Sequence, residues 1–242
     1  MKNTLFLLGS LLLLLCPSTK AQFNENPVLN IPTYDEPVLN WGYFLGLNQY
    51  GFKFDYKNNN TNSLDEVLVI KNFGFNVGLI GEMRLNKFLD IRFEPGLHYN
   101  ARSLRFPYIT NSNTNSLDIR EVKSTYINFP ILLKVSTKRI GNWKPFLIGG
   151  FSTSINLGSN ETSLDDNSTG RKDSFRMKKN IYSYEIGFGI DFYTEYFKFA
   201  PSIRGVFAIS DELVRDENPN SQWTGNIAGM RTRGIFINFT FE

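Results

Sequence analysis

The residue types that most often carry catalysis are scarce in this chain of 242 residues. His98 is its only histidine and Cys16 its only cysteine. A Ser-His-acid triad would have to use His98, yet no serine stands in a recognisable nucleophile motif. One histidine and one cysteine are also too few for an ordinary transition-metal site. The sequence therefore predicts a protein that is not an enzyme and that uses no metal or cofactor.

Two pairs of adjacent acidic residues are the remaining candidates for chemistry. Asp165-Asp166 and Asp211-Glu212 both lie in long polar segments. Neighbouring carboxylates can bind Ca²⁺, but the residues around these pairs lack the ligand spacing of a calcium loop. We therefore expect both pairs to form solvated surface.

Composition narrows the class of protein further. The 26 basic and 23 acidic residues give a net charge of +3; removing Lys2 and Lys20 with the leader described below leaves 24 basic residues and a net charge of +1. A nearly neutral chain gives no electrostatic basis for binding nucleic acid. Aromatic residues make up 15% of the chain, which argues against intrinsic disorder. The mean hydropathy of −0.25 fits apolar residues that alternate with polar ones.

The first 21 residues have the features of a secretory signal peptide. A basic residue precedes a short apolar stretch, and Ala21 supplies the small residue expected at the cleavage site. Lipidation of Cys16 is the alternative, although a large leucine precedes it where lipoprotein cleavage requires a small residue. We expect cleavage after Ala21, an N-terminal segment of residues 22–40 and a single domain of residues 41–242.

Period-two alternation dominates the hydrophobic pattern beyond residue 40. The clearest case runs from Leu89 to Ala101, where apolar residues mostly occupy odd positions and polar or charged residues mostly occupy even ones. Because successive side chains of a strand point to opposite faces, this segment predicts a strand with one apolar and one charged face. No apolar stretch in this region approaches the roughly 18 residues of a transmembrane helix.

The same pattern predicts eight strands in all. They cover residues 41–54, 73–82, 89–101, 125–135, 145–157, 183–192, 197–210 and 231–241. Short connections near residues 86–87, 136–142 and 194–195 alternate with long polar ones at 55–71, 104–118, 158–178 and 211–228. These features together predict an all-β fold, an eight-stranded antiparallel transmembrane β-barrel of the outer membrane with short periplasmic turns and long extracellular loops. A soluble lipocalin-type barrel or a β-sandwich is the alternative.

Aromatic residues and prolines add detail to this barrel. The aromatic residues beside the start of the barrel and the predicted short turns are Trp41, Phe88, Trp143, Tyr193 and Tyr196. Such a belt is typical of one surface of a lipid bilayer. Pro95 and Pro201 lie inside predicted strands, and since proline cannot donate to a ladder, we expect bulges there. The alternating last strand, with Phe241 near its end, resembles the signal that the barrel-assembly machinery reads.

Eight strands enclose an interior just wide enough to be filled by side chains. The alternation predicts that these charged or titratable residues face the lumen: Arg84, Asp90, Arg92, Glu94, His98, Arg102, Lys134, Glu185, Asp191, Lys198 and Arg204. Both signs occur in similar numbers, so we expect a mutually neutralising structural network in which His98 lies among charges. A path for ions or protons is the alternative. Folded cargo could not pass through so narrow a lumen.

Three regions of the chain resemble one protein family. They are residues 30–37 with 41–48, the motifs Tyr-Ile-x-Phe-Pro (126–130) and Lys-Pro-Phe-x-x-Gly-Gly (144–150), and residues 184–192 with 197–199. Together these regions resemble the PorT proteins of Bacteroidota, small outer-membrane barrels associated with the type IX secretion system and with gliding motility. The resemblance spans nearly all of the chain beyond the leader.

This resemblance implies an accessory role in the export of proteins with C-terminal sorting signals, without the barrel being the conduit. Other secretion-system proteins would be partners, and no catalytic residue transfers. Pro27, Pro32 and Pro37 predict an extended periplasmic segment that either docks on a partner or serves as a tether. Three other functions stay open: a structural or adhesive barrel similar to OmpA or OmpX, a narrow channel for small solutes, and an enzyme with catalytic groups at the barrel rim.

Overall fold

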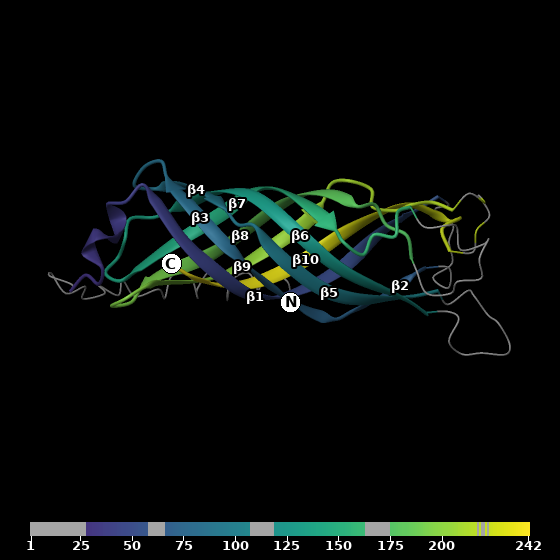
Figure 1. Cartoon of the computed structure of the whole chain (residues 1–242), viewed down its shortest axis with the longest axis horizontal. Coiled ribbons are helices and arrows are strands. Elements are labelled where there is room, and N and C mark those ends of the chain that lie inside the picture. Colours follow the sequence, from purple (N-terminus) through teal and green to yellow (C-terminus); the bar gives the residue numbers. More distant parts are fainter. Residues whose placement is uncertain are drawn as a thin grey trace, which may run out of the picture.

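The computed structural model describes residues 28–57, 66–106, 119–162, 175–216, 218, 221 and 223–242. Within these ranges the chain forms one short 3-10 helix, η1 (Pro32–Asp35), and ten antiparallel strands (Figure 1). The strands are β1 (Leu39–Tyr56), β2 (Leu68–Lys71), β3 (Phe73–Arg84), β4 (Leu89–Phe93), β5 (Gly96–Arg105), β6 (Ile119–Ser136), β7 (Trp143–Asn156), β8 (Asn180–Tyr193), β9 (Lys198–Ala208) and β10 (Ile227–Phe241). No helix among the described residues is long and apolar enough to cross a membrane. The predicted signal peptide lies outside these residues.

The ten strands close into a barrel with eight strand positions. β1 closes the ring because it pairs with β10 on one side and with β3 on the other. β4 and β5 share one position, since both pair with β3 on one side and with β6 on the other. β2 and β3 are separated only by Asn72. The predicted eight-stranded antiparallel barrel is therefore confirmed, with two of its strands interrupted.

Pro95 and Pro201, where bulges were expected, do not shift the pairing register. Residues on either side of Pro95 pair with β3 and β6 in one continuous register. Pro201 lies opposite Phe239 in an unbroken register with β10. The predicted bulges are therefore wrong. Proline lacks an N–H but keeps its acceptor, and the N–H of Leu79 donates to the carbonyl of Pro95 over 3.0 Å.

Apolar side chains cover the outside of the barrel, whereas polar ones fill much of its interior. On β1, Tyr43, Leu45 and Leu47 are exposed, whereas Phe44 and Asn48, at positions of the opposite phase, are each 1% exposed. An outer wall of this kind matches the hydrocarbon of a bilayer, and the closed ring pairs the backbone groups that lipid cannot satisfy. The soluble alternatives would bury the apolar face and do not fit this arrangement.

Phe44 shows why two glycines are needed inside the barrel. Its ring lies directly over β3 and β5, where a Cβ added to Gly78 would lie 2.5 Å from its Cε1 atom. A Cβ added to Gly96 would lie 2.7 Å from its Cζ atom. Side chains at either position would displace the ring from the wall of the lumen.

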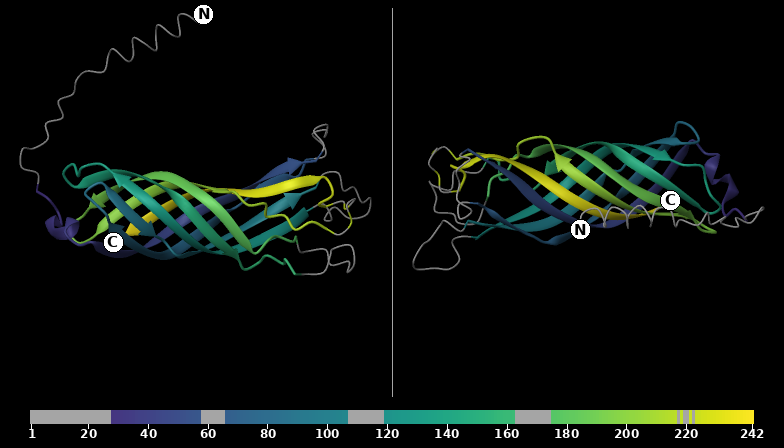
Figure 2. Two further views of the ribbon diagram at one scale, coloured as in Figure 1. Left: turned by 90° about the horizontal axis from the view of Figure 1, so that it is seen from above. Right: turned by 180° about the vertical axis from the view of Figure 1, so that it is seen from behind.

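Short turns and long connections leave from opposite ends of the barrel (Figures 1 and 2). The short turns at residues 85–88, 137–142 and 194–197 gather with the N-terminal segment and the C-terminus at one end. We call this the short-turn end and the opposite one the long-loop end. The described parts of the long connections pack against each other and against strand ends at the long-loop end.

The predicted aromatic belt at the short-turn end needs one correction. Trp41, Phe88, Trp143 and Tyr196 are exposed there, as expected of such a belt. Tyr193 is only 3% exposed, because the alternation of β8 turns it inward. The prediction that Tyr193 belongs to the belt is therefore wrong.

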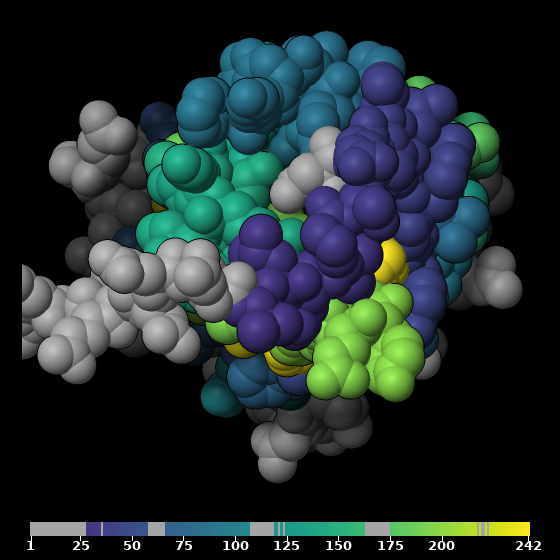
Figure 3. All heavy atoms as spheres, turned by 90° about the vertical axis from the view of Figure 1, so that its left-hand side faces the viewer, coloured from purple at the N-terminus to yellow at the C-terminus, as the bar shows by residue number. Residues whose placement is uncertain are grey.

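The segment before β1 folds over the short-turn end of the barrel (Figure 3). Pro32 begins η1, where the first turn of a helix needs no N–H donor, and Ile31 before it has a positive φ of 44°. The N–H of Tyr34 donates to the carbonyl of Ile31 over 3.2 Å. The expectation of an extended segment is therefore wrong for its described part. We call residues 28–38 the cover.

Candidate functional site

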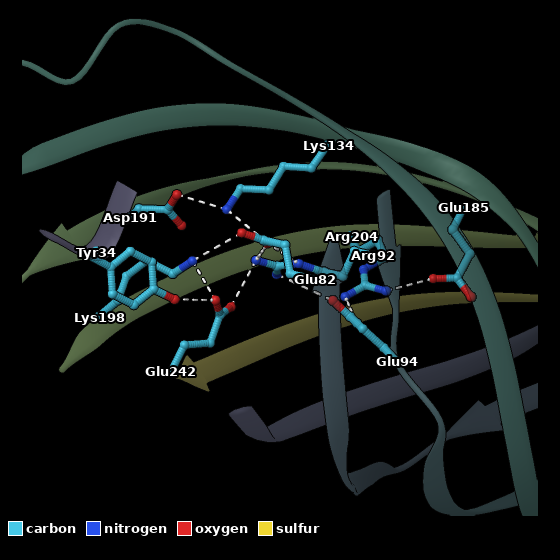
Figure 4. Close-up of polar contacts among 10 residues, drawn as sticks. All are labelled: Tyr34, Glu82, Arg92, Glu94, Lys134, Glu185, Asp191, Lys198, Arg204 and Glu242. Carbon is cyan, nitrogen blue, oxygen red and sulfur yellow. Dashed lines mark hydrogen bonds and ion pairs between the residues drawn. The ribbon is translucent and has the colours of Figure 1, made fainter. Parts of the chain in front are cut away.

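Glu82 on β3 is the centre of a buried group of charges near the short-turn end (Figure 4). Arg92 on β4 donates from Nε to Glu82 Oε2 over 2.8 Å, and Lys134 on β6 donates to the same oxygen over 3.2 Å. Lys198 on β9 donates to Glu82 Oε1 over 3.2 Å. Lys134 also pairs with Asp191 on β8 over 2.8 Å. One carboxylate thus draws together cations from three other strands, and each of these side chains is at most 2% exposed.

A second set of ion pairs extends from this group along the lumen. Glu94 accepts from Arg92 Nη1 over 3.3 Å and from Arg204 Nη2 over 2.6 Å. Arg204 Nη1 donates in turn to Glu185 Oε2 over 2.9 Å. Each of the two guanidinium groups therefore bridges at least two carboxylates, which connects β4, β8 and β9 inside the barrel.

The C-terminal residue brings β10 and the cover into the same group. Glu242 Oε1 accepts from Arg92 Nη2 over 2.9 Å, and its carboxylate also pairs with Lys198. Tyr34 of the cover donates from Oη to Glu242 Oε2 over 2.8 Å. We call the following nine residues the charge network: Glu82, Arg92, Glu94, Lys134, Glu185, Asp191, Lys198, Arg204 and Glu242.

The structure places the residues predicted for the lumen in three surroundings. Ten of the eleven are at most 3% exposed, and the side chain of Arg84 is 14% exposed. Arg84 and Asp90 form their own pair over 3.6 Å beside the charge network. Seven residues belong to the network itself: Arg92, Glu94, Lys134, Glu185, Asp191, Lys198 and Arg204.

His98 and Arg102 are not members of the charge network and contact aromatic rings beside it. The Nδ1 atom of His98 lies 3.2 Å from Tyr50 Oη, and its ring meets Phe236 edge-on with a centroid distance of 5.0 Å. Arg204 and Glu94 also lie within electrostatic reach of His98, so charges surround it as the alternation predicted, and the aromatic rings of β1 and β10 are contacts that the prediction did not include. The guanidinium of Arg102 lies over the Phe52 ring, 3.8 Å from its centroid.

Four buried asparagines connect strands in the middle of the lumen. Asn48 Nδ2 donates to Asn76 Oδ1 over 2.6 Å, and Asn76 Nδ2 donates to Asn238 Oδ1 over 2.6 Å. Asn100 Nδ2 donates to Asn48 Oδ1 over 3.0 Å. This neutral ladder crosses β5, β3, β1 and β10, the side of the barrel where the charge network is sparse.

Sequence reasoning left four residues out of this site. Glu82 and Glu242 follow the alternation of their strands, which would have placed both in the lumen. Lys144 on β7, which is 5% exposed, also keeps the inward phase of its strand. Tyr34 lies outside any strand, so periodicity gives no signal for its contact with the network.

Glu212 corrects the expectation that both acid pairs are solvated. Its side chain is buried, and its carboxylate accepts from the N–H and the Oγ1 of Thr232 over 2.7 and 2.8 Å. Burial raises the pKa of Glu212 to about 7, against the opposing charge of Arg102. Asp211 stays partly exposed and pairs with Arg215 over 3.0 Å. Asp165-Asp166 lies outside the described residues.

The cover is held to the barrel by a compact set of contacts. The N–H of Asn30 donates to Asn142 Oδ1 over 2.9 Å, and Asn142 Nδ2 donates to the carbonyl of Val28 over 3.1 Å. Arg139 donates to the carbonyl of Asn30 and lies over the ring of Tyr193, 3.8 Å from its centroid. A turn and the end of β8 therefore fix the cover in place.

Tyr34 is the deepest contact between the cover and the lumen. Its ring meets Tyr193 edge-on at a centroid distance of 5.7 Å, and Lys198 Nζ lies 4.9 Å from the centre of its ring. Burial is the largest cause of a strongly raised pKa for Tyr34, so the phenol stays neutral and donates to Glu242.

A groove of about 590 Å³ remains between the cover and two of the short turns. Its lining combines five basic residues with three apolar ones: Leu29, Pro32, Arg84, Lys87, Phe88, Lys138, Arg139 and Lys144. Arg84 and Arg139 are engaged by the contacts described above, whereas Lys87 and Lys138 lie on exposed turns. The groove therefore gives the short-turn end a cationic surface.

The chemistry available to the charge network is electrostatic. No group of three or more His, Cys, Asp or Glu residues in the described part of the chain could hold a metal ion. Each carboxylate of the network contacts at least one cation from another strand. Such pairs tie strands together and neutralise each other in a low-dielectric interior.

Comparison with known proteins gives a family and several similar folds. A family described as "Outer membrane protein beta-barrel domain" matches residues 21–214. Neisserial surface protein A is 12% identical, with 84% of this chain and 97% of that chain covered and a TM-score of 0.44. Pseudomonas aeruginosa OprG is 11% identical, with 83% and 94% covered and a TM-score of 0.43. The N-terminal barrel of Pseudomonas aeruginosa OprF is 12% identical, with 84% and 98% covered and a TM-score of 0.37. No curated protein matches the sequence significantly.

Proposed function

Because the chain belongs to the outer membrane protein β-barrel domain family, we propose that it serves as a closed structural barrel of the outer membrane, which carries its long loops outside the cell. The protein is an outer-membrane protein, so its short-turn end faces the periplasm and its long-loop end faces the exterior. The observation that carries the proposal is the convergence of Arg92, Lys134 and Lys198 on buried Glu82.

A network of this kind favours a structural lumen over a path for solutes. A conducting pore needs water along its length and charges that passing ions can reach. Here the network residues Arg92 and Lys134 are each at most 2% exposed, and each contacts two or more carboxylates. Opening a path would separate ion pairs in a low-dielectric interior, which costs several kcal/mol for each broken pair.

Planar-bilayer recording of the refolded protein tests this proposal. We expect no stable current steps from the wild-type barrel, and none from a variant that lacks residues 28–37, because the network closes the lumen without the cover. Steady single-channel current from either protein would overturn the proposal and favour the channel alternative. The variant Glu82→Ala, inserted in parallel, reports whether the network is the barrier.

An accessory role in type IX secretion is the second candidate, and the periplasmic end of the barrel favours it. The cover exposes Val28, Leu29 and Val38 to the periplasm, next to the cationic groove. An apolar segment beside a row of basic residues is a surface that another protein can recognise. The resemblance to PorT proteins points to other secretion-system components as the partners.

Quantitative proteomics of culture medium and periplasm separates the two candidates. Deletion of the gene should leave proteins with C-terminal sorting signals in the periplasm if the secretion role is right, and complementation should restore their export. Complementation with Lys87→Glu/Lys138→Glu tests the groove, with Lys57→Glu/Lys179→Glu at the opposite end as a matched control. An unchanged secretome in the deletion strain would sink the secretion role and leave the structural one.

A further inference from the structure

A cluster of basic residues lies on the outer wall of the barrel, where its apolar surface ends toward the exterior. On β10, the outward residues Ile235, Ile237 and Phe239 are apolar, and the next outward positions are Arg233 and Arg231. On β1 the outward residue Leu47 is followed at the next outward positions by Gln49, Gly51 and Lys53. The change from apolar to basic residues marks the level where hydrocarbon gives way to lipid headgroups.

Four cations gather at this level on three neighbouring strands. Lys53 lies directly opposite Arg231, and Arg233 lies opposite Gly51 in the pairing of β1 with β10. Lys71 at the end of β2 reaches across to β1, so that its Cε atom would lie 2.7 Å from a Cβ on Gly51. Because Gly51 has no side chain, Lys71 can lie against the wall beside Arg233.

Among the described residues, two of the four cations share one carboxylate, which leaves the cluster with an excess of positive charge. Asp55 lies 3.6 Å from Lys53 Nζ and 3.4 Å from Arg231 Nη2. Arg233 and Lys71 form no ion pair with any described residue. The side chains of Lys53 and Arg231 are each 46% exposed, so they are accessible from the lipid side.

The cations occupy one sector of the wall and do not form a complete ring. Arg233 lies opposite Phe207 on β9, and Phe207 lies opposite Tyr184 on β8. Those two rings stack at a centroid distance of 5.1 Å. At this level the wall therefore changes from aromatic residues on β8 and β9 to basic residues on β10, β1 and β2.

We propose that this sector binds the phosphates of the phosphorylated glycolipid of the outer leaflet, lipopolysaccharide. The site needs a ligand that carries several negative charges at the headgroup level and acyl chains below it. Two arginines supply fork-shaped donors for phosphate oxygens, and the lysines add mobile positive charge. Ile235 and Leu47 offer an apolar surface for the chains directly beneath. The bound lipid would fix the orientation of the barrel in the outer leaflet.

Titration of the full refolded chain in detergent micelles tests the proposal. The micelles carry lipopolysaccharide, the same lipopolysaccharide after removal of its phosphates, or phosphatidylglycerol. We expect Arg231→Gln/Arg233→Gln to weaken binding of intact lipopolysaccharide by roughly tenfold or more, from the loss of two headgroup-level cations. The control Lys178→Gln/Lys179→Gln makes the same change of charge beside β8 at the long-loop end, outside this sector, and should leave affinity unchanged.

Three outcomes would overturn the proposal: equal affinity of the arginine variant, equal affinity for the dephosphorylated lipid, or equally tight binding of phosphatidylglycerol. A thermal melt of each variant checks its folding. If the arginine variant does not fold, Lys53→Gln/Lys71→Gln carries the same test, with the same expected direction and the same overturning outcomes.

Discussion

The two ends of the lumen are filled by different chemistry. At the periplasmic end the charge network joins β3, β4, β6, β8, β9 and β10 through ion pairs. At the extracellular end the interior is an apolar cluster, which we call the outer core: Val67, Leu104, Phe106, Val122, Phe175, Met177, Leu213, Ile227 and Met230. The asparagine ladder and a group of aromatic rings lie between them.

The origin of the residues explains this difference. The charge network comes almost wholly from strand positions, where each inward side chain has lipid-facing neighbours on both sides. The outer core includes Phe106, Phe175 and Leu213, which belong to the long connections. These three residues lie beyond the ends of the strands, and hydrophobic burial holds them in place as in a soluble domain. The barrel therefore combines a polar membrane core with a small water-facing apolar core.

Removal of Glu82 should break the charge network and produce the largest loss of stability. Glu82→Gln leaves three buried cations without their shared carboxylate, and we expect a loss of about 4 kcal/mol in the free energy of unfolding. Urea unfolding in detergent micelles, followed by tryptophan fluorescence, measures it. The control Glu195→Gln changes an exposed turn residue and should cost almost nothing. A loss below 1 kcal/mol for Glu82→Gln would show that the network does not hold the barrel together.

A cavity in the outer core should sharpen the contrast between the two ends. Leu104 is fully buried, so Leu104→Ala should cost about 3 kcal/mol through lost burial and an unfilled cavity. Limited proteolysis should then cut the long connections faster, whereas Glu82→Gln should leave their cleavage rates nearly unchanged. Leu97→Ala, on the lipid face of the same strand, is the matched control. Equal proteolysis of both core variants would mean that the two ends unfold as one unit.

Glu212 gives the extracellular end a dependence on pH that the apolar residues around it lack. Its pKa of about 7 exceeds the ordinary value of 4.5, mainly because of burial. Between pH 4.5 and about 7, Glu212 therefore keeps its proton in the folded protein but releases it in the unfolded chain. Its contribution to stability is fully present below pH 4.5 and is lost as pH rises through about 7.

Unfolding at pH 5 and pH 8 measures this effect. The free energy of unfolding of the wild type should fall by about 2 kcal/mol more than that of Glu212→Gln between these values. The neighbouring Asp211→Asn is the control. Burial tends to raise the pKa of Asp211, but hydrogen bonds from the Met230 and Leu213 N–H groups keep it below its ordinary value. Asp211 therefore titrates below pH 5 and should not add to the change between pH 5 and pH 8. If the free energy of unfolding changes equally with pH in the wild type and in Glu212→Gln, the raised pKa of Glu212 is contradicted.

The sequence was sufficient to predict the barrel because alternate residues of each strand face lipid and the lumen. Lipid favours apolar side chains, whereas the lumen accepts polar ones. The phase of Leu89 to Ala101 already separates Asp90, Arg92 and Glu94 from the apolar face, and the structure keeps that separation. Alternation predicts which face of the sheet a side chain lies on, but it does not predict which side chains it contacts across the lumen. Pairing across the lumen depends on the register and tilt of strands far apart in sequence. The ring contact of His98 with Phe236 on β10 is one example, because alternation on its own strand gives no sign of it.

Features outside the strands could not be read from periodicity. Tyr34 reaches Glu242 because the cover turns at Pro32 and crosses the mouth of the barrel, a path that depends on Arg139 and Asn142 in a distant turn. Glu212 is buried because the connection after β9 folds back onto β10. In both cases contacts with residues distant in sequence determine the surroundings of the side chain, and the local sequence pattern cannot predict those contacts.

Loss of the Tyr34 hydroxyl should have the smallest effect and should act only at the periplasmic end. Tyr34→Phe keeps the ring against Tyr193 and Lys198 but removes the hydrogen bond to Glu242, which should cost about 1 kcal/mol. Because the cover is a local unit, we expect faster hydrogen exchange of residues 30–36 and an unchanged rate for the outer core. Tyr43→Phe, on the lipid face, is the matched control. Faster hydrogen exchange in the outer core as well would show that the cover, the charge network and the outer core open together. The two ends of the lumen would then differ in composition but not in local stability.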